Sequence, residues 1–114
     1  EWYKSSKINK IYNTFFSILL EQEREKNYQN CEMRFEEFIN KGAIEEVKFL
    51  KDRDFDRSLP GFKCLGVNWI LKYLEKEISL KDAIILSKRD TRRYVKRQLT
   101  WFKHNFNPDL ILKI

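Results

Sequence analysis

The segment from Lys81 to His104 collects cationic side chains of the kind that bind phosphate groups. It holds eight lysines and arginines against two acids, Asp82 and Asp90, a balance of +6. The whole 114-residue chain also carries a formal net charge of +6, so the remaining residues sum to zero. A single basic element on a neutral body is typical of a protein that binds a polyanion.

If residues 79–104 form one helix, these cations share a face. At 100° per residue, an arc of about 140° contains Arg89, Arg92, Arg93, Lys96, Arg97, Thr100 and Lys103. Like charges four residues apart repel each other, and no acid on the arc offsets that repulsion. The planar guanidinium of arginine also suits phosphate. The pattern therefore favours polyanion binding over an ordinary solvated face, and leaves RNA, DNA and anionic lipid open.

The opposite side of the same helix is expected to pack against the rest of the protein. It contains Ile84, Thr91, Tyr94, Val95, Gln98, Trp101 and Phe102. Trp69 and Trp101 have rings that could stack on nucleobases. Both lie in apolar stripes, which favours core packing, and Leu99 and Phe102 are expected in the core as well.

The rest of the sequence excludes several other kinds of chemistry. Cys31 and Cys64 stand far apart and His104 is the single histidine, so no metal-ligand spacing is present and no metal site is predicted. The two cysteines are expected to be reduced, partly buried thiols of a cytosolic protein. No phosphate-binding loop of the G-x-x-x-x-G-K-[ST] type occurs. No apolar run reaches the roughly 18 residues that span a membrane.

The elements that must position the cations are mostly helical. Three glycines and two prolines in 114 residues leave few breaks, which favours helices over many short strands. Helices are expected over residues 21–40, 43–51, 64–74 and 79–104. Gly42 would end the first helix in the left-handed conformation, and a capping box from Ser79 to Asp82 would start the last. Asn107-Pro108 would end it.

Residues 5–20 remain ambiguous. Their apolar side chains recur at helical spacing, yet Ile11–Leu20 is also a short apolar run rich in aromatic and β-branched residues, as in a buried strand. Such a strand is expected to lack a partner within this chain, so it would have to pair with a sheet supplied by other sequence.

Four segments resemble one known family. They are KRDTRRYVKRQLTWFK (Lys88–Lys103), KCLGVN (Lys63–Asn68), YLEKEISLKDAI (Tyr73–Ile84) and RFEEFINKGAIEEV (Arg34–Val47). In order and spacing they resemble the carboxy-terminal part of the tRNA dimethylallyltransferases, also called tRNA isopentenyltransferases. The run Lys96–Lys103 is the most specific part, and the likeness covers about residues 1–104.

The resemblance implies a fold and an activity. Such enzymes transfer a dimethylallyl group from its diphosphate to the exocyclic amine of an adenine beside the anticodon. The chain would be a mainly α carboxy-terminal fragment of a P-loop-type α/β parent, with residues 1–20, including a strand near 12–20, at the edge of the parent core. Residues 21–114 would be the helical part that contacts tRNA.

The resemblance also implies what this chain lacks and where it works. The phosphate-binding loop and the catalytic aspartate would lie in a preceding amino-terminal domain, so the chain alone is expected to be inactive. Magnesium and dimethylallyl diphosphate are implied for the parent and no cofactor for this chain. The expected partner is the anticodon arm of tRNA in the cytoplasm, with no membrane contact.

Single residues carry over where the motifs match. Arg34 matches an arginine near the diphosphate, where a cation offsets the charge of the leaving group, although the residue alone reads as an exposed helix arginine. The first tRNA-contacting stretch corresponds to Lys63, Cys64, Leu65, Gly66 and Asn68. The second gives Lys96, Arg97, Gln98, Thr100, Trp101 and Lys103, to which the basic arc adds Arg89, Arg92 and Arg93. Gln98 lies off that arc.

Two alternatives stay open. The family usually has tyrosine and then a cation after the glycine of the first stretch, whereas this chain has Val67-Asn68, which suits a split or decayed gene product that has lost activity. The other is a self-contained helical nucleic-acid-binding module without catalysis. Residues 11–20 discriminate, because part of an enzyme should show a strand with an exposed apolar face and a module should show a helix without one.

Overall fold

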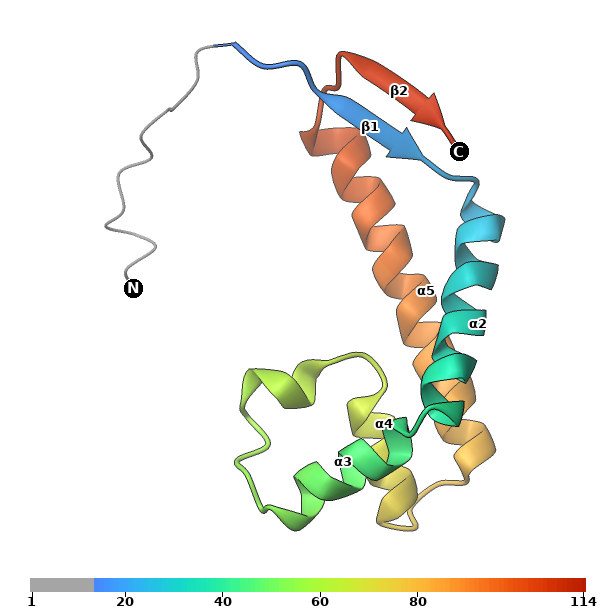
Figure 1. Ribbon diagram of the computed structural model, residues 1–114, viewed down its shortest axis with the longest axis vertical. Coiled ribbons are helices and arrows are strands. Elements are labelled where there is room, and N and C mark those ends of the chain that lie inside the picture. Colours follow the sequence, from blue (N-terminus) through green and yellow to red (C-terminus); the bar gives the residue numbers. More distant parts are fainter. Residues whose placement is uncertain (1–13) are drawn as a thin grey trace, which may run out of the picture.

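Two long helices, α2 (Arg24–Asn40) and α5 (Leu80–Asn105), form the frame of the structure, a computed structural model that describes residues 14–114. The two helices lie side by side at one end and separate towards the other, where two short strands lie (Figure 1). The mainly α fold expected from the sequence is confirmed.

Three short helical elements pack at the end where α2 and α5 meet. They are α3 (Ala43–Asp52), the 3-10 helix η1 (Pro60–Lys63) and α4 (Val67–Leu74). Their apolar side chains form the main core cluster, which consists of Val47, Phe62, Ile70 and Leu71. Each is at most 5% exposed, so this corner of the molecule is the part with a closed hydrophobic interior.

The predicted end of α2 and start of α5 are confirmed, whereas the starts expected at residues 21 and 64 are wrong, because α2 begins at Arg24 and α4 at Val67. Gly42 has a φ of 106°, the left-handed conformation that glycine adopts without strain. The Ser79 side chain accepts a hydrogen bond of 3.1 Å from the backbone N–H of Asp82, so it caps α5. The helix then continues to Asn105, one residue beyond the expected end.

Small residues let α4 approach α2 and α5 closely. Gly66, immediately before α4, has a φ of +91°, and a Cβ there would lie 2.7 Å from Cε2 of Phe35 on α2 and 3.4 Å from Oγ of Ser87 on α5. Ala83 and Ser87 are fully buried, and the Ser87 hydroxyl donates to the Ala83 carbonyl over 2.7 Å. The three helices therefore meet at a point where a side chain on Gly66 does not fit.

The strand expected near residues 12–20 is present as β1 (Ile18–Glu21); residues 12 and 13 lie outside the described part of the chain. The expectation that this strand lacks a partner is wrong. β1 pairs in parallel with β2 (Leu110–Lys113), with Ile18 opposite Leu110. α5 ends at Asn105, and the apolar run after Pro108 is too short for periodicity to reveal a strand.

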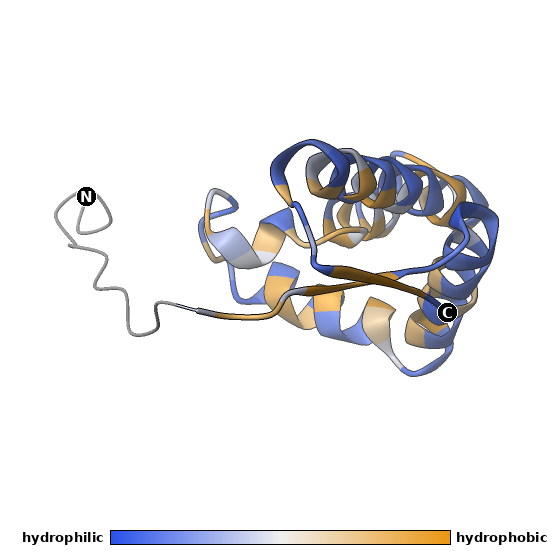
Figure 2. Cartoon of the chain, turned by 90° about the horizontal axis from the view of Figure 1, so that it is seen from above, coloured by the Kyte–Doolittle hydropathy of each residue, from blue (hydrophilic) through white to orange (hydrophobic). Residues whose placement is uncertain are grey.

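The two-stranded sheet is uncovered on the described part of the chain. Ile18, Leu20, Ile111 and Leu112 are between 43% and 61% exposed, and Phe15, just before β1, is 83% exposed. Figure 2 shows β2 as a strongly hydrophobic segment. Parallel strands are normally buried on both faces, so this small sheet is an apolar surface of the kind that other protein normally covers.

Candidate nucleic-acid interface

The first half of the basic face of α5 consists of Arg89, Arg92 and Arg93 together with the neighbouring Lys88, and all four cations pair with acids of the protein. Lys88 forms an ion pair with Glu36, and Arg92 forms one with Glu32, both on α2. The Arg92 guanidinium also lies over the Tyr28 ring, 5.4 Å from its centroid. These two cations therefore help to hold α5 against α2.

Asp90 holds the other two arginines of this half. Its Oδ1 accepts hydrogen bonds from Nε and Nη2 of Arg89 at 3.2 and 3.1 Å and lies 3.9 Å from Nη1 of Arg93. The expectation that no acid offsets the repulsion on this face is therefore wrong. Two of the acids belong to another helix, and the third lies beside the arc, so the periodicity of α5 could not reveal them.

A pairing signal was nevertheless present in the sequence. Glu32 and Glu36 stand four residues apart on α2, and Lys88 and Arg92 stand four residues apart on α5. Residues four apart lie on one helix face, so two such pairs of opposite charge match when the helices run side by side. A helical wheel of α5 alone does not contain Glu32 and Glu36, so it cannot predict these pairs.

The second half of the basic face is open. Lys96, Arg97 and Lys103 are exposed and form no ion pair with any residue from 14 to 114. The Arg97 guanidinium lies 5.7 Å from the centroid of the Tyr94 ring. The Thr100 hydroxyl donates to the Lys96 carbonyl over 2.9 Å and keeps its own acceptor capacity. These three free cations can receive phosphate groups without first breaking an internal pair.

Aromatic rings accompany these free cations. Trp101 is 55% exposed and meets Phe102 edge to face, with 5.3 Å between the ring centroids. The expectation that Trp101 and Phe102 are core residues is wrong, since Phe102 is also 38% exposed, and Leu99 is half-buried. The reason is geometric: α2 and α4 pack on the first half of α5 and leave its last turns uncovered (Figure 1).

The stretch from Lys63 to Asn68 lies before and at the start of α4. Lys63, Cys64, Leu65 and Asn68 are exposed, whereas Gly66 is buried against Phe35. Leu65, which the sequence places in a helix over 64–74, is 45% exposed, and Cys64 is an exposed free thiol rather than a partly buried one. The reason is that α4 begins at Val67, so both residues belong to the loop after η1.

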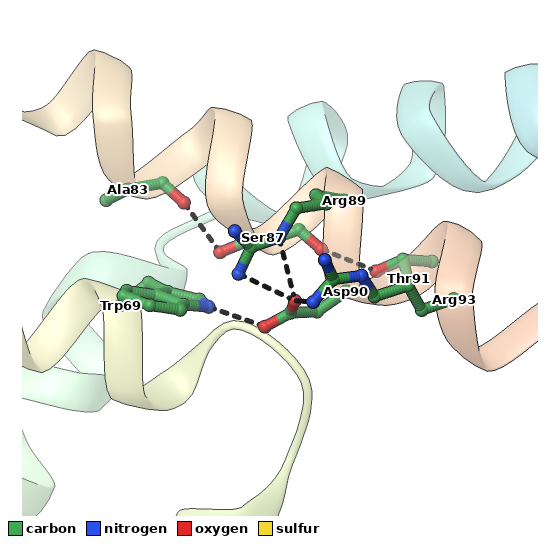
Figure 3. A network of polar contacts seen from close by, with 7 residues as sticks. All are labelled: Trp69, Ala83, Ser87, Arg89, Asp90, Thr91 and Arg93. Atoms are coloured by element: carbon green, nitrogen blue, oxygen red, sulfur yellow. Dashed lines mark hydrogen bonds and ion pairs between the residues drawn. The ribbon is translucent and has the colours of Figure 1, made fainter.

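Trp69 joins this stretch to the basic face through Asp90 (Figure 3). The indole Nε1 donates to Asp90 Oδ2 over 2.7 Å. That bond lowers the pKa of Asp90; desolvation raises it by less, and the Arg89 guanidinium lowers it further, so the pKa lies below its usual value. Trp69 itself is half-buried, between the core and free surface. Asn68, Trp69 and Lys72 also line an open pocket of about 380 Å³.

Arg34 stands apart from these residues. It is exposed on α2, with its guanidinium 5.3 Å from the centroid of the Phe38 ring, and it forms no ion pair with any residue from 14 to 114. Across residues 14–114, no group of three or more His, Cys, Asp and Glu side chains could hold a metal ion. No helix in that range is long and apolar enough to cross a membrane.

The chain is similar to known proteins over most of its length. The family model for IPP transferase matches residues 1–105. The chain is 47% identical over 100 residues to the tRNA dimethylallyltransferase of Alkaliphilus oremlandii and 42% identical over 97 residues to that of Clostridioides difficile. These matches cover 88% and 85% of this chain and 32% and 31% of the relatives, so the chain spans about a third of their length.

Solved structures share the fold. The tRNA isopentenylpyrophosphate transferase from Bacillus halodurans superposes with a TM-score of 0.75 at 33% identity, over 87% of this chain and 31% of that one. The Staphylococcus epidermidis tRNA delta(2)-isopentenylpyrophosphate transferase gives 0.78 at 29% identity, over 90% and 33%. The sequence match over nearly the whole chain, together with this shared fold, means that the chain belongs to the IPP transferase family.

Proposed function

We propose that this chain is the part of a tRNA dimethylallyltransferase that binds tRNA. The observation that carries the proposal is the open half of the basic face, where Lys96, Arg97 and Lys103 are exposed and unpaired within the described chain beside an exposed Trp101. Cations bind the phosphate backbone, and an exposed indole can stack on an unpaired base. An anticodon stem-loop has both a phosphate backbone and unpaired bases.

The first and second halves of the basic face would then have different roles. Phosphate contacts from the open half position the anticodon arm without reading its sequence. Arg89 and Arg93 join the grip through guanidinium donors that Asp90 leaves free, whereas Arg92 is committed to Glu32 and contributes less. The exposed stretch before α4 gives a second contact. The proposed tRNA-binding residues are Lys63, Cys64, Leu65, Asn68, Arg89, Arg93, Lys96, Arg97, Gln98, Thr100, Trp101 and Lys103, with Gly66 acting through its buried packing.

We further propose that a P-loop-type α/β domain covers the uncovered sheet of β1 and β2. The exposed apolar residues of that sheet, the uncovered last turns of α5 and the share of about a third of its relatives' length all support this partner. That domain would hold dimethylallyl diphosphate and magnesium, for which residues 14–114 offer no clustered ligands. Arg34 would approach the diphosphate, and this chain alone would not transfer the group.

The proposed reaction is the transfer of the dimethylallyl group to an adenine. The exocyclic nitrogen forms a bond to the allylic carbon, the carbon–oxygen bond to diphosphate breaks, and the amine releases a proton. The adenine must leave its stack to be reached, so a firm hold on the surrounding stem is required. The reaction acts on tRNA, which we expect this protein to meet in the cytoplasm.

A self-contained nucleic-acid-binding module is the alternative. It predicts a helix at residues 11–20 and no large exposed apolar face. The strand β1 and the 68% exposed Phe16 favour part of an enzyme over such a module. If the chain is instead a decayed gene product, Val67 and Asn68 remove one RNA contact, and the unaltered chain should fail to bind the stem-loop even at low salt.

The test is binding to an anticodon stem-loop with an unmodified adenine, measured across a salt series. Phosphate contacts from Lys96, Arg97 and Lys103 alone predict that log K falls against log salt with a slope of roughly −2 to −3, and each contact added by Arg89, Arg93 or Lys63 makes that slope steeper by a little less than one. Replacing Lys96 and Arg97 by glutamate should weaken binding and flatten that slope. The matched control, Lys26→Glu with Lys48→Glu, makes the same charge change at exposed positions on α2 and α3.

Each outcome has a clear meaning. Equal losses in the two double variants would show that net charge, rather than the open half of the basic face, governs binding. No binding of the unaltered chain at low salt would overturn the gripping role for this chain.

A further inference from the structure

One polar network links the two surfaces that the proposed function assigns to RNA. Trp69 directly follows Asn68 in the first turn of α4, and Asp90 lies between Arg89 and Arg93 on α5. Figure 3 shows the Trp69 indole pointing from α4 to the Asp90 carboxylate, with both arginines reaching towards the same group. The network is the direct polar link between the start of α4 and the basic face within residues 14–114.

We propose that Asp90 is a positioning residue for RNA binding. Its carboxylate holds Trp69 with one oxygen and Arg89 and Arg93 with the other, so that the start of α4 and the cations of α5 meet the RNA as one rigid surface. This inference rests on the proposed tRNA-gripping function.

The hydrogen-bond geometry divides the carboxylate between two tasks. Oδ2 is taken by the Trp69 N–H at 2.7 Å, and Oδ1 is taken by two N–H groups of Arg89 at 3.1 and 3.2 Å. A guanidinium has five N–H donors, so Arg89 keeps three for other partners. Arg93, 63% exposed and 3.9 Å from Oδ1, keeps more. Asp90 therefore orients both guanidinium groups and leaves their outer donors available for phosphate.

Side chains around Trp69 and Asp90 hold α4 and α5 in a fixed position relative to each other. The Trp69 ring has Lys72 at 5.2 Å and Arg89 at 5.7 Å from its centroid, so the indole is fixed by its N–H and by two cations. One turn earlier, Gly66 packs against Phe35 with no room for a Cβ. On α5 the Thr91 hydroxyl donates to the Ser87 carbonyl over 3.0 Å, next to Asp90. The link is thus built into close packing on both helices.

Because Asp90 is an acid within a surface proposed to bind a polyanion, electrostatics and positioning predict opposite effects of its removal on RNA affinity. Asp90→Asn raises the formal net charge from +6 to +7, so a purely electrostatic surface would bind RNA more tightly. If Asp90 positions its neighbours, the same change should weaken binding roughly five- to tenfold, the scale of one lost ordinary hydrogen bond. The salt slope should flatten by about one contact.

Two further variants complete the experiment. Trp69→Phe keeps an aromatic ring at this position and removes the N–H, so it should cause a similar loss, and the double variant should lose little more than either single one. Glu46→Gln on α3 removes one exposed negative charge that takes no part in the network and should leave binding unchanged or slightly tighter. All variants are compared well below their melting temperatures, where each is folded by circular dichroism.

The outcomes separate this inference from the proposed function. If the unaltered chain binds the stem-loop and the variant with Lys96→Glu and Arg97→Glu does not, the proposed tRNA-binding function is supported. If Asp90→Asn then binds as tightly as the unaltered chain, or with an unchanged salt slope, the positioning role is overturned while the tRNA-binding function survives. If the unaltered chain does not bind at all, both fall together.

Discussion

Alanine at Gly66 tests the close approach of α2, α4 and α5. Gly66 has a φ of +91°, and the new Cβ would lie 2.7 Å from Cε2 and 3.2 Å from Cζ of Phe35. A left-handed backbone costs a non-glycine residue about 1–2 kcal/mol. Inserting a methyl group into a closely packed site typically costs another 1–3 kcal/mol. We therefore expect Gly66→Ala to lower the free energy of unfolding by about 2–5 kcal/mol.

The other two glycines of the chain separate these two costs. Gly42 has a φ of +106°, but a Cβ there would meet only Glu45 Oε2 at an ordinary 3.7 Å, so Gly42→Ala should cost about 1–2 kcal/mol. Gly61 has neither a positive φ nor any atom within 4 Å of a Cβ, so Gly61→Ala should change the free energy of unfolding by less than about 1 kcal/mol in either direction.

Urea unfolding followed by far-ultraviolet circular dichroism measures all three variants. For a chain of this size, each kilocalorie lost should also lower Tm by roughly 4–8 °C. A Gly66→Ala variant no less stable than Gly42→Ala would refute the packing argument, because it would mean that the Phe35 ring turns aside at no cost. As a check on the cause, Gly66→Ala made together with Phe35→Leu should recover most of the excess loss.

Three further predictions follow from single contacts. The pKa of Asp90 is lowered chiefly by the Trp69 N–H, so the ionised carboxylate stabilises the fold at neutral pH. That stability is lost as the pH falls below the usual aspartate pKa of about 4. Asp90→Asn should therefore flatten the acid end of a plot of stability against pH measured by circular dichroism. Asp109 accepts from the Ser17 N–H and hydroxyl at 2.7 and 2.8 Å, so Asp109→Ala should speed amide hydrogen exchange in β2 while leaving the amides of α4 protected; unchanged exchange in β2 would contradict this. Leu20 is 61% exposed on the uncovered sheet, so Leu20→Lys should reduce self-association, measured by light scattering, without lowering Tm. A large loss of Tm would mean that the sheet is already buried in the free chain.

Local signals account for the part of the fold that the sequence predicts well. A glycine after an apolar stripe ends α2 at the expected place, and a serine three residues before an aspartate starts α5. Such signals act within one turn of helix and depend little on the rest of the chain. For the same reason, the cations of α5 were correctly placed on one helix, and the family motif within Lys96–Lys103 could be read directly.

The errors concern contacts between elements far apart in the chain. The partner strand of β1 lies 92 residues away and is too short to have a pattern of its own. Glu32 lies on another helix, so the pairing of Arg92 was invisible on the helical wheel. Trp101 looked like a core residue because its neighbours are apolar, but burial depends on whether another element covers that turn. Sequence pattern shows which face is apolar and does not show what covers it.

The parallel pairing of β1 and β2 has a consequence for the order of folding. The helical part leaves the sheet at Glu21 and returns to the neighbouring strand at Leu110, so the strands close a loop that contains every helix of residues 14–114. Contacts within and between adjacent helices form fast because they are local, whereas closing a long loop costs chain entropy that a four-residue strand pair repays poorly. The helices should therefore assemble first and draw the two strands together, so that the sheet of β1 and β2 forms only after the basic face of α5 is in place.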